Sequence, residues 1–246
     1  MHCLVWEGLG NRLNALASCI ATGRDVELVW AVNSHCPLLY HEVLKPIDGV
    51  TVQNVNARRF TYSRNAHRYC YYYLTNLTEN SNRQFGCDVR KIYRQLLRSL
   101  TAPRPTLPNS KTMAGIHYRA HMPESPTVDQ FIEQADRWLA KRNSQSVFVS
   151  SDSAEAQQRI ADTIANSFTI DQQHIASDLQ RSRASVTDCV RAMKAFKSCK
   201  LGVFASTFRS TVTDAVRSWV HVDYAEREQN HRNQSLERWV ASNGNT

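Results

Sequence analysis

A histidine and an arginine stand close together where the sequence predicts that a buried strand ends. The predicted strand covers residues 113–118, and its last residues read Gly-Ile-His-Tyr, followed by Arg119. Side chains alternate along a strand, so His117 and Arg119 share one face while Ile116 and Tyr118 share the other. An imidazole and a guanidinium side by side suit the base and a phosphate of a nucleotide. The alternative interpretation is a surface ion pair of the arginine or a solvated arginine.

Hydroxyl groups follow a second predicted strand, at residues 201–205. Ser206, Thr207 and Ser210 come directly after it, where the sequence predicts that a helix begins. Hydroxyl groups and unpaired N–H groups at a helix start can hold a phosphate. We therefore expect these three residues to contribute to an anion site.

Two aspartates lie at predicted helix starts. The strand at 146–150 runs into Ser-Asp-Ser, where Asp152 or Ser153 is expected to cap the next helix. Asp188 lies near the start of the helix predicted for 186–198, where capping is again the simplest role.

A glycine pair follows the first predicted strand. In the segment Gly-Leu-Gly-Asn, which ends at Asn11, the glycines Gly8 and Gly10 let the backbone approach a ligand, and the helix start that follows favours an anion. The segment lacks the third glycine of a dinucleotide fingerprint and the Lys-Ser/Thr of a Walker loop. A plain turn between a strand and a helix is the alternative.

Strands and helices alternate along most of the chain, which predicts an α/β fold with a parallel, doubly wound sheet in its second part. Ligands of such sheets collect at the carboxyl ends of the strands. Three prolines within residues 101–111 predict a linker between an N-terminal lobe (1–105) and a C-terminal lobe (106–246). Residues 50–87 are expected to be irregular. The predicted strands are 2–6, 27–32, 113–118, 146–150, 168–170, 201–205 and 220–224, and the predicted helices are 11–22, 88–100, 128–142, 154–163, 186–198 and 208–217.

The composition favours a soluble protein with an anionic partner. The net charge is +8 and the pI is about 9.3, which suits nucleic acid, a phosphorylated small molecule or an acidic glycan. No nucleic-acid motif accompanies the charge, so no nucleic-acid partner is expected. There is no apolar run of membrane-spanning length and no signal-peptide pattern, which predicts a cytoplasmic protein. The seven scattered cysteines form no C-x-x-C pair and are expected to be reduced.

Taken in order, four segments resemble the fucosyltransferase superfamily with a GT-B-like fold, especially the alpha-1,6-fucosyltransferases and the peptide-O-fucosyltransferases. They read GLGNRL, GIHYR, VFVSSDS and TDCVRAMKAFKSCKLGVFASTFRSTV, within residues 6–13 and 113–216. The resemblance implies two Rossmann-like lobes that face a cleft. It also implies that the N-terminal lobe takes the acceptor and the C-terminal lobe binds the nucleotide sugar.

The resemblance also implies roles for individual residues. His117 is implied to contact guanine, Arg119 the β-phosphate of GDP, and Asp188 the guanine N1 and N2 atoms. Asp152 matches the aspartate that follows the middle strand in the family. The remaining implied nucleotide contacts are Gly8, Gly10, Asn11, Ser206, Thr207 and Ser210.

The chain departs from the family pattern directly after Arg119. The family motif continues with a second arginine and then Thr-Asp, whereas Ala120, His121 and Met122 stand here. This departure leaves the donor sugar open between fucose and another GDP-linked sugar.

Sugar transfer needs stabilisation of the leaving diphosphate and removal of a proton from the acceptor hydroxyl. No Asp-x-Asp motif occurs in the chain, so we expect no metal and no other cofactor. Arg119, together with the helix start at residues 206–210, is expected to take the charge-stabilising role. Glu124 is the first candidate for the base. Glu7, Asp129 and His121 are alternatives.

The sequence therefore predicts an inverting, metal-independent glycosyltransferase that moves a sugar from a GDP-sugar to a glycan hydroxyl. The segment 58–73, rich in arginine and tyrosine, is the candidate acceptor surface. A non-catalytic nucleotide-sugar binding protein is the first alternative, and a basic nucleic-acid binding protein is the second. The sequence makes no prediction of the oligomeric state.

Overall fold

The chain divides into two compact units, each of which contains its own parallel β-sheet. Unit 1 comprises Met1–Pro105, Asp171–Lys194 and Asp214–Trp219, and unit 2 comprises Thr106–Ile170, Ala195–Thr213 and Val220–Thr246. The computed structural model describes residues 2–5, 8–21, 25–56, 89–103, 105–107, 110–171, 181–207 and 210–226.

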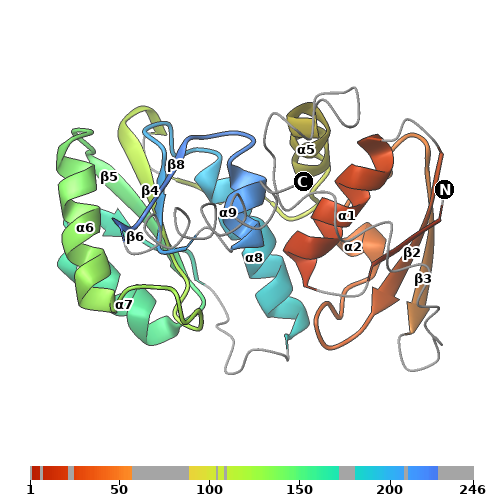
Figure 1. Cartoon of the computed structure of the whole chain (residues 1–246), viewed down its shortest axis with the longest axis horizontal. Coiled ribbons are helices and arrows are strands. Elements are labelled where there is room, and N and C mark those ends of the chain that lie inside the picture. Colours follow the sequence, from red (N-terminus) through yellow and green to blue (C-terminus); the bar gives the residue numbers. More distant parts are fainter. Residues whose placement is uncertain are drawn as a thin grey trace, which may run out of the picture. The chain divides into compact units, whose positions relative to one another are not determined.

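Unit 1 contains a three-stranded parallel sheet in the order β1-β2-β3. Helix α1 packs on β1 and β2 and also contacts α5 (Figure 1). Because α1 lies between the sheet and α5, most of its side chains are buried. The elements are β1 (His2–Val5), α1 (Leu9–Ala21), β2 (Val26–Val32), α2 (Tyr40–Val43), β3 (Val50–Asn56) and α5 (Val89–Arg98).

A buried arginine joins α1 to the sheet of unit 1. Arg12 is only 1% exposed, and its guanidinium lies 4.7 Å from the centre of the Trp30 ring. Its Nη1 donates to the carbonyl of Ala31 at 2.6 Å, and its Nη2 donates to Oδ1 of Asn33 at 3.1 Å. A charged group is tolerated in a core only with such partners, so these contacts fix α1 against the carboxyl end of β2.

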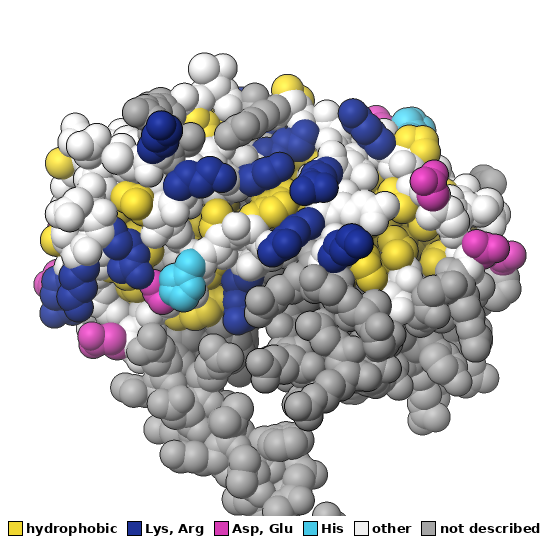
Figure 2. All heavy atoms as spheres, turned by 90° about the horizontal axis from the view of Figure 1, so that it is seen from above, with side chains coloured by type: hydrophobic (Ala, Val, Ile, Leu, Met, Phe, Trp, Pro, Cys, Tyr) yellow, Lys and Arg dark blue, Asp and Glu magenta, His cyan; other side chains and the backbone are white. Residues whose placement is uncertain are grey.

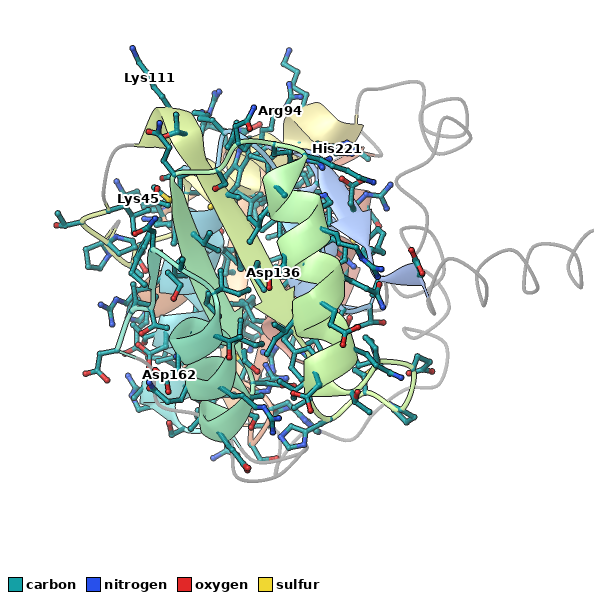
Figure 3. All side chains as sticks on the ribbon, turned by 90° about the vertical axis from the view of Figure 1, so that its left-hand side faces the viewer. Lys45, Arg94, Lys111, Asp136, Asp162 and His221 are labelled. Carbon is teal, nitrogen blue, oxygen red and sulfur yellow. The ribbon has the colours of Figure 1, made fainter. Side chains whose placement is uncertain are left out.

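Unit 2 contains a five-stranded parallel sheet in the order β6-β5-β4-β7-β8. Figure 3 shows two helices, α6 and α7, side by side in front of this sheet, with Asp136 on α6 and Asp162 on α7. Its elements are η2 (Ser110–Thr112), β4 (Met113–Tyr118), α6 (Val128–Ala140), β5 (Ser146–Ser151), α7 (Ala154–Thr163), β6 (Ser167–Phe168), β7 (Val203–Ala205) and β8 (Val222–Tyr224).

The central strand β4 is buried along its whole length because side chains cover both faces of the sheet. On one face, Phe131 of α6 stacks on Phe204 of β7 with ring centres 5.3 Å apart. On the other face, a Cβ at Gly115 would lie 2.8 Å from Phe196 and 3.1 Å from Cys199. Only glycine at this position leaves room for the side chains of Phe196 and Cys199 to pack so close to the strand.

Two helices contribute residues to both units. Helix α8 (Arg183–Phe196) belongs to unit 1 up to Lys194, and helix α9 (Thr211–Val216) belongs to unit 2 up to Thr213. Unit 1 therefore includes segments that the sequence assigns to the C-terminal lobe.

The predicted α/β class with parallel sheets is confirmed. Strand β3 was not predicted, because it lies within the stretch expected to be irregular. Helix α1 begins two residues earlier than expected and α8 three residues earlier, whereas α9 is shorter than its prediction. Within the described part of the chain, no helix is both long and apolar enough to cross a membrane.

Candidate functional site

The order of the strands in unit 2 creates a switch point between β4 and β7. The chain proceeds from β4 to β5 and β6 on one side, and then to β7 and β8 on the other. At such a point the connections leave in opposite directions and open a crevice beyond the carboxyl ends of the strands. His117 pairs with Ala205 in the last register position, so Arg119 and Ser206 follow directly at this edge. The segment that ends in Arg119 and the hydroxyl-rich segment that begins at Ser206 are thus neighbours at this edge.

Arg119 forms an ion pair with Asp152 across this edge of the sheet. Its Nε lies 3.0 Å from Oδ2 of Asp152, and their side chains are 23% and 11% exposed. The other carboxylate oxygen accepts from the backbone N–H of Ala120 at 2.7 Å. Among the described residues, both terminal nitrogens of Arg119 lack a partner. The aspartate therefore orients the guanidinium and leaves two donor nitrogens available to an anion.

His117 is buried beneath this edge and lies 3.1 Å, through Nε2, from Oγ of Ser210. Its ring also meets Phe196 edge-on, with centres 5.6 Å apart. Burial lowers the pKa of His117 to about 3. The positive charge of Arg119 also lowers this pKa, whereas a hydrogen bond with the backbone of Ser150 raises it. The imidazole is therefore neutral at pH 7, and it holds Ser210 in place as a hydrogen-bond partner.

The hydroxyl residues after β7 are buried. Ser206 and Thr207 are 0% exposed and Ser210 is 1% exposed. Oγ of Ser206 accepts from the backbone N–H of Arg119 at 2.9 Å and lies 3.0 Å from Oγ of Ser125. The structure thus joins His117 to Ser210 and Arg119 to Ser206 by direct contacts, although the hydroxyl groups point to protein partners.

The base candidates lie in different surroundings. Glu124 is half-buried in the turn that follows Arg119, with Oε2 shielded from solvent, and His121 is exposed in the same turn. Asp129 pairs with Arg159 at 2.6 Å on the exposed surface of α6 and α7. Glu7 lies outside the described residues, as does the proposed acceptor segment 58–73.

The remaining predicted contacts belong to unit 1. Gly8 precedes α1, whereas Gly10 and Asn11 lie inside its first turn. A Cβ at Gly8 would lie 3.6 Å from Cζ of Arg181, so a guanidinium packs close to this backbone. Asp188 lies in α8 and forms an ion pair with Arg191 at 3.1 Å.

The capping prediction for Asp188 is wrong. Helix α8 begins at Arg183, and Oγ of Ser182 accepts from the backbone N–H of Ser185 at 3.0 Å, as an N-cap does. Asp188 therefore lies beyond the first turn. In contrast, the cap predicted for α7 is confirmed at Ser153, whose Oγ accepts from the N–H of Ala156 at 3.2 Å.

Two residues that lie beside the predicted contacts were not identified from the sequence. Ser125 contacts Ser206 across 81 positions of sequence, and Arg181 approaches Gly8 from a distant segment. Neither residue belongs to a recognisable local motif, so only the tertiary structure reveals them.

Positive charge is plentiful on the surface. Figure 2 shows many Lys and Arg side chains and few Asp and Glu side chains on one face of the molecule, in agreement with the net charge of +8. On α5, the side chains of Lys91, Arg94 and Arg98 are exposed. Within the described ranges, no group of three or more His, Cys, Asp or Glu side chains is arranged to hold a metal ion.

Comparison with known proteins gives matches among solved structures. The crystal structure of NodZ alpha-1,6-fucosyltransferase soaked with GDP-fucose matches with a TM-score of 0.55 and 14% identity, over 89% of this chain and 91% of that chain. The same enzyme co-crystallised with GDP gives the same values. This chain has a fucosyltransferase-like fold.

The crystal structure of fucosyltransferase NodZ from Bradyrhizobium also matches, with a TM-score of 0.52 and 12% identity, over 89% of this chain and 92% of that chain. No protein-family model matches the chain. No curated protein matches it either. The resemblance found in the four sequence segments is thus confirmed at the level of the fold.

Proposed function

We propose that this protein is a glycosyltransferase that moves a sugar from a GDP-sugar to a hydroxyl group of a glycan. The observation that carries this proposal is the position of Arg119 at the switch point of the unit 2 sheet. The fold resembles that of an enzyme solved with GDP and with GDP-fucose, which favours GDP as the nucleotide.

Arg119 is the proposed contact for the diphosphate. Asp152 holds its Nε, and the two terminal nitrogens present a planar pair of donors that matches two oxygens of one phosphate. A hydrogen bond between charged partners contributes about 1.5–3 kcal/mol. That contribution grows as negative charge develops on the leaving diphosphate, so it lowers the barrier as well as the binding free energy.

The reaction is a single displacement. The oxygen of the acceptor hydroxyl attacks the anomeric carbon, the bond from that carbon to the diphosphate oxygen breaks, and GDP leaves with the electron pair. The hydroxyl proton passes to Glu124, which follows Arg119 by five positions. Attack opposite the leaving group inverts the anomeric configuration. In this scheme Arg119 supplies the positive charge, so the proposed reaction requires no metal.

The proposed location is the cytoplasm. Five cysteines of the described residues are free thiols, and four of these are buried, which suits a reducing compartment. The glycan acceptor is proposed to contact the segment 58–73, which lies outside the described residues.

The test is a transfer assay with the full chain. Purified protein is incubated with several GDP-sugars and neutral or acidic oligosaccharide acceptors, with and without EDTA. GDP release and the mass of the product are measured, and NMR gives the anomeric configuration. We expect EDTA-resistant transfer with inversion from one GDP-sugar.

Other outcomes contradict parts of the proposal. A product with retained configuration contradicts the single displacement. Binding of GDP-sugars without transfer or hydrolysis supports the alternative of a non-catalytic binding protein. Steeply salt-dependent binding of RNA or DNA that GDP does not displace supports a nucleic-acid binding protein instead.

A further inference from the structure

One buried hydroxyl joins three segments at the carboxyl edge of the unit 2 sheet. Ser206 is 0% exposed, and its backbone N–H donates to the carbonyl of His117 at 3.0 Å. Its Oγ accepts from the backbone N–H of Arg119 at 2.9 Å and lies 3.0 Å from Oγ of Ser125. The hydroxyl is therefore enclosed by protein and already has two hydrogen-bond partners.

This hydroxyl replaces a backbone carbonyl in the ladder between β4 and β7. The bond from the N–H of Ser206 to His117 continues the parallel pairing beyond Ala205. The next bond of a regular ladder would run from the N–H of Arg119 to the carbonyl of residue 206. Here Oγ of Ser206 accepts that N–H instead. Arg119 thus keeps a strand-like position although the backbone ladder has ended.

The second contact extends this support to the turn that carries Glu124. Ser125 is 9% exposed, and its N–H donates to the carbonyl of Met122 at 3.0 Å, which closes the turn. Its Oγ then meets Oγ of Ser206. One hydroxyl therefore fixes both the backbone of Arg119 and the residue next to Glu124.

We propose that Ser206 is a positioning residue, which sets the phosphate-binding arginine and the base-bearing turn relative to each other without touching the donor. This role rests on the proposed function, because it gives Arg119 and Glu124 their tasks. In this role Ser206 acts through Arg119 and Ser125 and does not contact the phosphate directly. A nucleoside diphosphate would then gain affinity from Arg119 and little from the hydroxyl of Ser206.

The test compares Ser206→Ala with Ser125→Ala and a control, Ser198→Ala. Ser198 is also 0% exposed and belongs to unit 2, but it lies outside this network. We expect Ser206→Ala to lower kcat by about tenfold or more, because small displacements of catalytic groups cost large factors in rate. The Kd of GDP is expected to change by less than about threefold. Ser198→Ala is expected to keep both values.

Hydrogen–deuterium exchange of the same proteins tests the hydrogen bonds of Ser206 independently of catalytic activity. In Ser206→Ala the amide of Arg119 loses its acceptor, so peptides covering 119–125 should exchange faster, with or without GDP. Ser125→Ala breaks only the second contact, and it should lower kcat without faster exchange at Arg119. This variant tests the proposal even where Ser206→Ala fails to fold.

Three results would overturn the positioning role. The first is unchanged hydrogen exchange at residues 119–125 in Ser206→Ala. The second is an unchanged kcat of this variant despite faster exchange. The third is a loss of GDP affinity in this variant that is larger than its loss of kcat, which would make Ser206 a direct ligand contact. A wild-type protein that neither binds GDP nor transfers sugar would refute the proposed function, and the exchange result would still decide the network.

Discussion

The buried histidine of unit 2 should make the protein markedly less stable in mild acid. The pKa of His117 is lowered from 6.5 to about 3 in the folded protein, mainly by burial and also by Arg119. The unfolded chain therefore binds a proton at this position below pH 6.5, whereas the folded chain does not. Stability from this group is complete above pH 6.5 and falls as the pH drops toward 3.

The size of the effect follows from the two pKa values. Between pH 7 and pH 5 the proton uptake of the unfolded chain at this site lowers the free energy of unfolding by about 2 kcal/mol. For a chain of this length that corresponds to a decrease in Tm of roughly 4–8 °C. Below pH 5 the loss continues at up to about 1.4 kcal/mol per pH unit until the folded pKa is reached.

The assay compares wild type with His117→Gln by urea denaturation at pH 7 and pH 5, followed by fluorescence and far-UV circular dichroism. Glutamine keeps a hydrogen-bond partner for Ser210 but cannot titrate. Wild type should lose about 2 kcal/mol more than the variant between the two pH values. His121→Gln, in the same unit with an exposed side chain, serves as the control and should behave like wild type. Equal losses in wild type and His117→Gln would refute the argument, because they would mean that His117 titrates normally.

Three further substitutions test other parts of the structure. Arg119→Ala should reduce turnover by about a hundredfold or more, as removal of one charge-stabilising donor typically does, and near-normal turnover in a steady-state assay would remove its phosphate role. Gly115→Ala should destabilise unit 2 by about 1–3 kcal/mol because its Cβ would lie 2.8 Å from Phe196, and an unchanged Tm would show that the ring moves aside without cost. Ser153→Ala should cost about 1 kcal/mol through loss of the α7 cap, with kcat unchanged; a fall in kcat would show that the cap also supports the site.

The sequence predicted the elements that have strong local patterns. Strand β4 and helix α7 have the predicted bounds, because the first is mostly apolar and the second begins at a serine cap. Strand β3 escaped prediction since its residues are mostly exposed or half-exposed, and its formation depends on pairing with β2. The predicted start of α8 is three residues too late. The prediction relied on the periodic apolar residues of the helix, and these begin several positions after the residue that caps it, Ser182.

The position of three candidate residues at the carboxyl ends of neighbouring strands could be predicted from the sequence, whereas their contacts could not. The rule that ligands lie at the carboxyl ends of parallel strands identified His117, Arg119 and Ser206. It could not indicate that the imidazole is buried and neutral, nor that the hydroxyl of Ser206 bonds to a backbone amide. Those properties arise from packing between segments far apart in the sequence, as the contact with Ser125 illustrates.

Isothermal titration calorimetry with GDP tests the central proposal most directly, because it asks whether Arg119 at the switch point binds a diphosphate. The full chain is titrated with GDP, UDP and CMP, and the Arg119→Ala variant with GDP. We expect wild type to bind GDP in preference to the other two nucleotides, and the variant to bind GDP at least about tenfold more weakly, as loss of a charge-assisted hydrogen bond implies. Equal GDP affinity in the two proteins, or no binding by wild type, would show that Arg119 is not the diphosphate contact.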